Sequence, residues 1–169
     1  MNRKDNKSFW DKWAGRYDRF MSRDKNTYAQ IVNRMKRRMN RNMYVLELAC
    51  GTGLLSVQLA GSVKLLEATD FSEEMIRQAK QKCHSTRLHF SVQDATDLPY
   101  APQTFDAVII SNALHIMLQP EKALAEIRRI LKPDGFPTAP YDGYDESDDT
   151  VEKARSVQLK KAGHRLVLG

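Results

Sequence analysis

Three carboxylates stand in equivalent places along the chain, each at or just beyond the end of a short apolar segment. Glu47 lies in the first segment, Asp70 follows the second and Asp94 follows the third. A carboxylate has two acceptor oxygens, so it can bind both hydroxyls of a ribose or an exocyclic amine of a base. Each acid has a simpler explanation by itself, namely a charge at a helix N-terminus for Asp70 and a turn residue for Asp94. As a set, they favour a site for a nucleoside.

The sequence VLELACGTG places two glycines directly after the first acid. Gly51 and Gly53 carry no Cβ, so a ligand can approach the backbone closely, and the next helix begins there with free N–H groups. Ser56 stands where a dinucleotide fingerprint needs its third glycine, and no Gly-Lys-Ser/Thr sequence follows as in a P-loop. Both departures argue against NAD and ATP, although another nucleotide-binding α/β protein remains an alternative hypothesis.

Short apolar runs alternate with helical patterns from residue 43 onward. The pattern predicts strands at 44–48, 64–69, 87–92 and 105–110, and helices at 54–60, after the capping residue Ser72 and after Pro120. This alternation predicts a doubly wound, Rossmann-like α/β fold with a mainly parallel sheet and helices on both faces. Ligands of such sheets bind at the carboxyl ends of the strands, where the three acids lie.

The first 42 residues have a different character. Aromatic and methionine side chains recur there at helical spacing and predict amphipathic helices at 8–21 and 25–40. This region holds 13 Lys/Arg against 4 Asp/Glu, whereas the rest of the chain holds 14 against 17. The basic surface could meet an anionic substrate, a membrane or nucleic acid, or it could simply be a solvated helix face. We expect no nucleic-acid binding, because a basic and aromatic platform is missing.

Composition narrows the class of protein. The chain has 169 residues, of which 41% are apolar and 28% charged, as in a globular domain. No apolar run is long enough to span a bilayer and the first residues contain no signal-like apolar stretch. Cys50 and Cys83 form no CxxC pair, which fits a reduced, cytoplasmic protein without a disulfide or a zinc site. We expect no metal site elsewhere either.

The C-terminal third breaks the pattern. After LKPDG, which is expected to end the preceding helix with Gly135 just beyond it, the chain continues FPTAPYDGYDESDD. Pro137 and Pro140 cannot both donate to an interior ladder, so we expect a reduced or missing fifth strand. Strand four would then have an exposed edge, through which the chain could form a homodimer. The acids at 142–149 are interpreted as a solvated loop because they do not match a calcium loop, with a polar helix at 150–162 and a short strand at the end.

The ordered motifs ELACGTG, TDFSEEM, QDATDLP, FDAVIISNALH and LKPDG resemble the class I S-adenosylmethionine-dependent methyltransferases. The most similar branch is the small-molecule group that includes ubiquinone/menaquinone methyltransferases, whose N-terminal pattern also resembles WAGRYD. The resemblance covers residues 9–135 and implies three regions: an N-terminal helical lid at 1–42, a cofactor-binding α/β core at 43–135 and an atypical C-terminal segment at 136–169.

The resemblance also implies a role for individual residues. Glu47 would anchor the methionine amino end of S-adenosylmethionine, and Tyr17 would close over its carboxylate. Asp70 would hold the ribose hydroxyls, while Asp94 and the backbone of Ala95 would bind adenine. The remaining contacts would come from Ala49, Cys50, Gly51 and Gly53 around the sulfur, from Phe71 and Met75 against adenine, from Asn112 below the cofactor, and from Leu114 and His115 facing the transfer site. Ala49 replaces the first glycine of the family's usual G-x-G-x-G.

These residues lead to two functional hypotheses. The first is methyl transfer to a small-molecule acceptor, with the cofactor supplying the reactive group. The second is a cofactor-binding domain that is inactive or depends on a partner chain, because the C-terminal third is atypical. His115 is the weak candidate for a general base, against a role in packing. Cys50 is rejected as a nucleophile because no histidine is placed beside it. The sequence leaves the acceptor unassigned.

Overall fold

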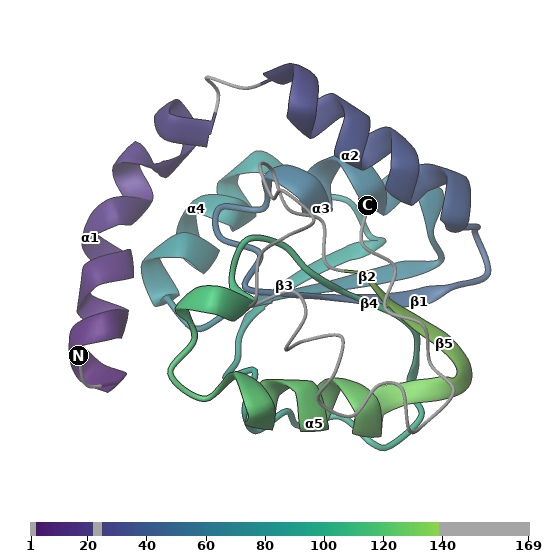
Figure 1. Ribbon diagram of the computed structural model, residues 1–169. Helices are drawn as coiled ribbons and strands as arrows, with labels where there is room; N and C mark the ends of the chain where they lie inside the picture. Colours follow the sequence, from purple (N-terminus) through teal and green to yellow (C-terminus); the bar gives the residue numbers. More distant parts are fainter. Residues whose placement is uncertain (1–2, 22–24, 139–169) are drawn as a thin grey trace.

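The computed structural model describes residues 3–21 and 25–138, which form one sheet and the helices around it (Figure 1). The elements follow one another as α1 (Arg3–Met21), α2 (Lys25–Arg38), β1 (Tyr44–Leu48), α3 (Leu54–Leu59), the 3-10 helix η2 (Ala60–Ser62), β2 (Leu65–Asp70), α4 (Glu73–Lys82), β3 (Leu88–Val92), β4 (Phe105–Ile110), the 3-10 helix η3 (Leu114–Ile116), α5 (Pro120–Ile130) and β5 (Leu131–Thr138). The four strands expected upstream of residue 111 are all present, within two residues of their predicted ends.

The five strands form a single parallel sheet in the order β3-β2-β1-β4-β5. The central strand β1 pairs with β2 on one side and with β4 on the other, so that Glu47 lies opposite both Ala68 and Ile109. The chain order reverses between β1 and β4, which is the point where open α/β sheets bind their ligands. The predicted doubly wound α/β fold is confirmed.

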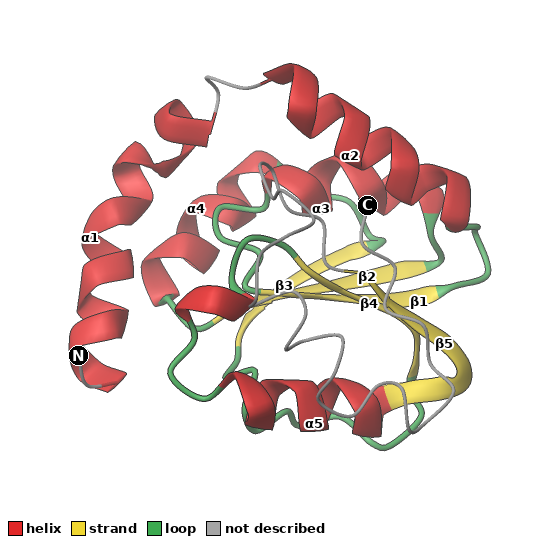
Figure 2. Cartoon of the chain, in the orientation of Figure 1, coloured by secondary structure: helices red, strands yellow, loops and turns green. Residues whose placement is uncertain are grey.

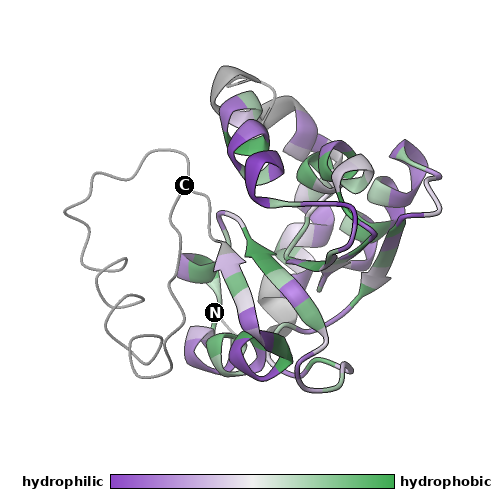
Figure 3. Ribbon diagram, turned by 90° about the vertical axis from the view of Figure 1, so that its right-hand side faces the viewer, coloured by the Kyte–Doolittle hydropathy of each residue, from purple (hydrophilic) through white to green (hydrophobic). Residues whose placement is uncertain are grey.

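Helices cover both faces of the sheet, as Figure 2 shows. One core lies between the sheet and α2, α3 and α4, and includes Val45, Ala107 and Ile109. The second lies between the opposite face and α5, and includes Leu46 and Val108. Neighbouring residues of one strand thus enter different cores, which explains why β1 and β4 are continuously apolar rather than alternating. In Figure 3 the strands are largely green, whereas the helices carry both purple and green faces.

Local sequence signals account for the helix boundaries. The hydroxyl of Ser72 accepts a hydrogen bond of 3.1 Å from the N–H of Met75, so Ser72 caps α4 as predicted. Pro120 occupies the first turn of α5, where its missing N–H costs nothing. Within the region 1–42, α2 packs on the sheet through Ile31, Val32 and Met35, while α1 packs against α4. Only α1 of these two helices extends to the carboxyl ends of the strands.

Of the two alternatives expected for strand five, a missing strand is wrong: the strand is present, although a bulge interrupts its pairing. β5 pairs with β4 from Phe105–Leu131 to Ile109–Thr138, so β4 is an interior strand without the exposed edge expected of it. Leu131 and Phe136 pair with Phe105 and Ala107, so the residues between them form a bulge. This bulge takes Pro133 and Gly135 out of the regular ladder, and Gly135 is a strand residue rather than the helix terminus that was expected. A proline at position 137 is tolerated because β5 has one neighbouring strand among the described residues.

Several expectations lie outside the described residues. These are Pro140, the acidic run at 142–149, the polar helix at 150–162 and the terminal strand. Within residues 3–21 and 25–138, no helix is long and apolar enough to cross a membrane.

Candidate functional site

A cavity opens at the carboxyl ends of the strands, between the sheet, α1 and the segment that follows β4. Its wall includes residues from the ends of β1, β2, β3 and β4, together with Trp10 and Tyr17 of α1. The complete lining consists of Trp10, Tyr17, Ala49, Gly51, Thr69, Asp70, Phe71, Met75, Gln93, Asp94, Ala95, Thr96, Ser111, Asn112, Ala113, Ile116, Met117, Leu118 and Gln119. The cavity therefore lies where the strand order reverses.

Residues Ala49 to Gly53 form a tight turn that we call the glycine turn. Ala49, Gly51 and Gly53 have φ values of 52°, 55° and 77°, in the left-handed region that glycine tolerates best. A Cβ added to Gly53 would lie 2.8 Å from Cζ of Phe90, and one added to Gly51 would lie 3.2 Å from Cε1 of Tyr17. Both glycines are thus needed for close approach as well as for backbone conformation. Ala49 holds a strained conformation at the position where the resembling family usually has glycine.

Asp70 connects the end of β2 with the glycine turn. Its Oδ2 accepts a hydrogen bond of 2.8 Å from the N–H of Gly51, and its Oδ1 accepts one of 2.9 Å from the N–H of Ser72. Burial raises the pKa of Asp70, the N–H groups of Ser72 and Gly51 oppose this shift, and the charge of Asp11 adds to it. Each carboxylate oxygen retains acceptor capacity toward the cavity, because a carboxylate can accept about four hydrogen bonds in total.

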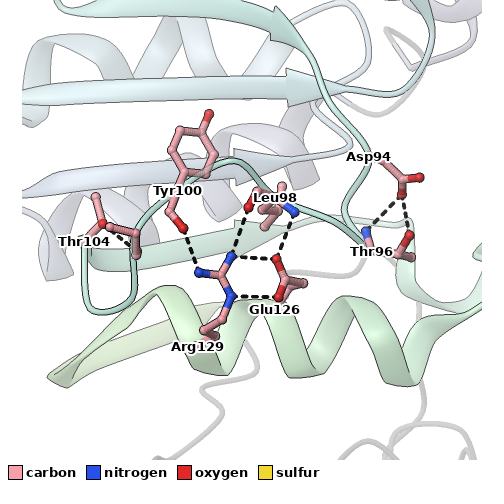
Figure 4. Close-up of polar contacts among 8 residues, drawn as sticks. Asp94, Thr96, Leu98, Tyr100, Thr104, Glu126 and Arg129 are labelled. Atoms are coloured by element: carbon pink, nitrogen blue, oxygen red, sulfur yellow. Dashed lines mark hydrogen bonds and ion pairs between the residues drawn. The ribbon is translucent and has the colours of Figure 1, made fainter.

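Asp94 lies near the start of the loop that leaves β3. Its Oδ1 accepts hydrogen bonds from the backbone N–H and the hydroxyl of Thr96, at 2.9 and 2.8 Å (Figure 4). The N–H of Gln93 donates to the carbonyl of Asp70 at 3.0 Å, which joins this loop to the end of β2. Asp70 and Asp94 therefore present carboxylates to the same cavity from two adjacent strands.

A polar clamp from α5 holds the following part of that loop. Arg129 donates to the carbonyls of Leu98 and Tyr100 at 2.9 and 2.7 Å and forms two bonds with the carboxylate of Glu126. The same carboxylate accepts a bond of 2.8 Å from the N–H of Leu98. Figure 4 shows the guanidinium between these groups. The clamp fixes the loop that carries Asp94 to the body of the protein.

Asn112 follows β4 and has a φ of 50°, the left-handed conformation that asparagine adopts more readily than most residues. It lines the cavity, and its buried Oδ1 has no hydrogen-bond partner among the described residues. A buried acceptor without a donor is costly, so its presence at a cavity wall indicates that a ligand or water supplies the donor.

Glu47 lies behind the glycine turn and Cys50 lies within it, and neither residue lines the cavity. Glu47 is only 2% exposed, and its Oε2 accepts a hydrogen bond of 2.6 Å from the hydroxyl of Ser56. Burial raises the pKa of Glu47 to about 8, against the opposing hydrogen bond from Ser56 and with the charge of Asp70 adding to the shift. Burial, followed by the charges of Glu47 and Asp70, raises the pKa of Cys50, which keeps the thiol protonated and unreactive.

Nine of the twelve residues proposed for cofactor binding line the cavity: Tyr17, Ala49, Gly51, Asp70, Phe71, Met75, Asp94, Ala95 and Asn112. The other three do not line it: Cys50 and Gly53 belong to the glycine turn, and Glu47 lies behind the turn. His115 is exposed on η3 and, like Leu114, does not line the cavity, so neither faces it as expected. No group of three or more His, Cys, Asp or Glu side chains that could hold a metal occurs in the described part of the chain.

Part of the lining was not predicted from the sequence. Trp10 belongs to the helical pattern of aromatic residues at 8–21, from which only Tyr17 was assigned to the cofactor. Residues 116–119 follow β4 and contribute three apolar side chains, Ile116, Met117 and Leu118. Their position just beyond the carboxyl end of an interior strand was the available signal. Asp18, which stands beside Tyr17 in WAGRYD, does not line the cavity, but its contact with Thr52 of the glycine turn was not predicted either.

Known proteins resemble this chain in sequence and in fold. Residues 45–135 match the family model described as a methyltransferase domain, which is more than half of the chain. The chain therefore belongs to the class I S-adenosylmethionine-dependent methyltransferase family, as its motifs suggest. Its similarity to curated proteins places it, within that family, in the quinone methyltransferase-like branch.

The matches with individual relatives cover only part of each relative's length. A demethylmenaquinone methyltransferase of Clavibacter sepedonicus is 41% identical over 124 residues, which cover 69% of this chain and 51% of the relative. Its counterpart from Leptospira interrogans is 34% identical over 141 residues, 75% of this chain and 56% of the relative. The protein bound to the Trm112 methyltransferase activator in a complex from Haloferax volcanii gives a TM-score of 0.69 at 30% identity, covering 76% of this chain and 57% of that one. The chain spans about half the length of the curated relatives it matches.

Proposed function

We propose that this chain binds S-adenosylmethionine in the cavity and transfers its methyl group to a small-molecule acceptor. The observation that carries the proposal is the meeting of Asp70 and Asp94 with the glycine turn in one cavity at the carboxyl ends of adjacent strands. A glycine turn that any Cβ would crowd and a buried Asn112 oxygen without a donor both suit a closely fitting polar ligand. These features fit the donors and acceptors of S-adenosylmethionine.

We assign the contacts as follows. Asp70 accepts from the ribose hydroxyls, Asp94 accepts from the adenine amine and the N–H of Ala95 donates to the adenine ring. Phe71 and Met75 pack against adenine, while Ala49, Cys50, Gly51 and Gly53 form the turn that accommodates the methionine part. Glu47 acts on the amino end through water, because it lies behind the turn, and Tyr17 covers the carboxylate end. Asn112 lies below the cofactor.

S-adenosylmethionine supplies an electrophilic methyl group when it is bound. The protein's task is to align the acceptor with that group and to exclude water, and positioning of this kind lowers a barrier by roughly 7–11 kcal/mol in well-oriented systems. Trp10 and Tyr17 of α1 cover the cavity for this purpose. We assign no role as a general base to His115, because it is exposed and does not line the cavity.

The acceptor proposed here is demethylmenaquinone in its reduced form, because several curated relatives are named for that substrate. The segment after β4 supports an apolar acceptor: Ile116 and Leu118 line the cavity, yet they remain 40% and 48% exposed. Exposed apolar side chains at a cavity wall are typical of a surface that an apolar ligand covers. The reduced ring is electron-rich, as attack on an electrophilic methyl group requires.

Calorimetric titration of the purified chain with S-adenosylmethionine and S-adenosylhomocysteine tests the proposal. We expect micromolar binding of both, followed by formation of S-adenosylhomocysteine when reduced demethylmenaquinone is added. A folded chain that binds neither compound contradicts the proposed function. A chain that binds both but turns over no acceptor contradicts only the transfer step.

The Asp70→Ala variant tests the ribose contact. We expect affinity for S-adenosylhomocysteine to fall by about tenfold or more, because hydrogen bonds to a charged acceptor are lost. Asp134→Ala, which removes an exposed carboxylate from the bulge of β5, is the control and should bind normally. Unchanged affinity in Asp70→Ala would refute this assignment.

A further inference from the structure

A second set of polar contacts joins α1 to the glycine turn outside the cavity. Asp18 near the end of α1 accepts a hydrogen bond through Oδ1 from the hydroxyl of Thr52. Its Oδ2 lies 2.5 Å from Nζ of Lys82, the last residue of α4. Nζ of Lys82 also donates to the carbonyl of Thr52 at 2.9 Å. We call these three residues the Asp18 cluster.

The cluster holds the centre of the glycine turn from two directions. Thr52 stands between Gly51 and Gly53 and is fully buried. Asp18 binds its side chain and Lys82 binds its carbonyl, so one helix that precedes the turn in the sequence and one that follows it contact the same residue. Both flanking glycines have positive φ values and lack a Cβ, so the turn contributes little stiffness of its own. External contacts therefore determine its conformation.

The cluster also determines where Tyr17 lies. Tyr17 precedes Asp18 on α1, and its ring lies against Gly51, where an added Cβ would be 3.2 Å from Cε1. Tyr17 and Gly51 both line the cavity, whereas none of the three cluster residues does. An attachment of Asp18 to the turn therefore fixes both the ring and the backbone that it covers.

Two polar residues in the first half of α1 contact the start of α4 instead of the turn. Asp11 accepts from the hydroxyl of Ser72 at 2.5 Å and from the N–H of Glu74 at 3.4 Å, at the start of α4. Lys7 lies 2.5 Å from Glu73 in the same region. These contacts dock the first half of α1 on α4, so Lys7 and Glu73 provide a matched control for an ion pair between the same two helices.

We propose that Asp18 is a positioning residue for cofactor binding, which acts through Thr52 and Lys82 to hold the glycine turn and Tyr17 in the geometry that receives the methionine part of the ligand. This inference rests on the proposed function. Asp18 and Lys82 have side chains that are 41% and 27% exposed, so water screens their attraction and the pair adds little to stability. Its effect is expected in affinity rather than in folding.

The test is a double-mutant cycle on the full chain, with affinity for S-adenosylhomocysteine measured by calorimetry. We expect Asp18→Asn and Lys82→Met each to weaken binding on the order of tenfold, and the double variant to be no weaker than the poorer single variant, because the two side chains act on the same residue. Thr52→Val, which keeps the shape and removes the hydroxyl, should resemble Asp18→Asn. The melting temperatures should stay close to that of the wild type.

The controls and the kinetics distinguish positioning from general packing. Lys7→Met and Glu73→Gln should bind as the wild type does. In turnover assays, Asp18→Asn should raise KM for S-adenosylmethionine and leave kcat at saturation nearly unchanged, which a merely destabilised protein would not do. If Asp18→Asn fails to fold, Thr52→Val and Lys82→Met provide the same comparison.

The outcomes separate the two proposals. A folded wild type that binds no S-adenosylhomocysteine overturns the proposed function and this inference with it. A wild type that binds, together with cluster variants that bind equally well, overturns the inference alone. Equal losses in Lys7→Met or Glu73→Gln also overturn it, because the effect would then belong to the docking of α1 as a whole.

Discussion

At the scale of the residue, Glu47 shows what burial does to an acid beneath a binding site. The carboxyl is almost fully buried, with the hydroxyl of Ser56 as its side-chain partner. Its pKa is raised from an ordinary value of 4.5 to about 8. The group therefore holds a proton at neutral pH in the folded chain and loses that proton in the unfolded chain.

This difference predicts how stability depends on pH. Between pH 4.5 and about 8 the folded state binds one proton more than the unfolded state at Glu47, so the free energy of unfolding falls as pH rises. The contribution of Glu47 protonation to the free energy of unfolding is complete below pH 4.5 and is lost as pH rises through about 8. Glu47→Gln should remove this slope, so that the difference between the melting temperatures of variant and wild type changes steadily between pH 5 and pH 8.

Thermal unfolding followed by circular dichroism at several pH values measures the effect. Ser56→Ala is the control, because it removes the hydroxyl but keeps the titrating carboxyl, and it should keep the pH-dependent loss of stability. Parallel pH profiles for Glu47→Gln and the wild type would show that Glu47 is ionised in the folded protein at neutral pH.

Gly53 permits a second prediction at this scale. Its φ is 77°, and an added Cβ would lie within 3 Å of two ring atoms of Phe90. Gly53→Ala should therefore lower the free energy of unfolding by about 2 kcal/mol, through backbone strain and overpacking together. Urea titration measures it. Gly61→Ala is the control, because nothing lies within 4 Å of the added Cβ, and an equal loss there would contradict the steric explanation.

At the scale of the element, the clamp of Arg129 and Glu126 stabilises the loop between β3 and β4. A lysine cannot reproduce the forked contacts to one carboxylate and two carbonyls. Arg129→Lys should cost about 1 kcal/mol, a figure reduced for the 34% exposure of this side chain. Urea unfolding tests this.

The matched control for Arg129 is Arg77, which also contacts a glutamate three residues earlier through two nitrogens. Arg77 has a side chain that is 57% exposed, and among the residues that the structure describes its guanidinium hydrogen-bonds to Glu74. Arg77→Lys should leave the unfolding midpoint unchanged. Similar losses in both variants would mean that the carbonyls of Leu98 and Tyr100 add nothing.

Strands and helices with a regular spacing of apolar residues were predictable from the sequence. The position of the cavity at the carboxyl ends of these strands was predictable as well. The strands through Ile110, the cap at Ser72 and the carboxylates Asp70 and Asp94 each depend on local signals that the structure retains. β5 was not predictable by the same rules, because its bulge removes Pro133 from the ladder and its position beside a single described strand tolerates Pro137. Neither property is visible in the local sequence.

Contacts over long sequence separations escaped prediction for a related reason. Asp18 and Thr52 are 34 residues apart, and Arg129 reaches Leu98 across 31 residues. Asp18, Thr52 and Arg129 are polar residue types that are common at protein surfaces, and no sequence periodicity distinguishes them. His115 is the opposite case, since its position after a strand suggested a site residue, whereas the lining includes its neighbours Ala113 and Ile116 but not His115.

At the scale of the whole molecule, ligand binding should couple to folding, since the cavity is built from α1, the glycine turn and the ends of four strands. A ligand that binds only the folded state adds about 2.7 kcal/mol at a concentration 100 times its Kd. S-adenosylhomocysteine should then raise the melting temperature by roughly 5–10 °C. Thermal scans with increasing ligand measure this. A melting temperature that stays constant would contradict binding to the folded chain.

The placement of α1 over the cavity also has a consequence in time. Trp10 and Tyr17 belong to the wall, and the same helix is attached through Asp11 and Asp18. We expect displacement of the helix, on the scale of microseconds to milliseconds typical of such motions, to ease the passage of a molecule as large as a nucleoside. The lifetime of the bound product, and with it the maximal turnover rate, would then follow the opening of α1 and would slow in a viscous solvent.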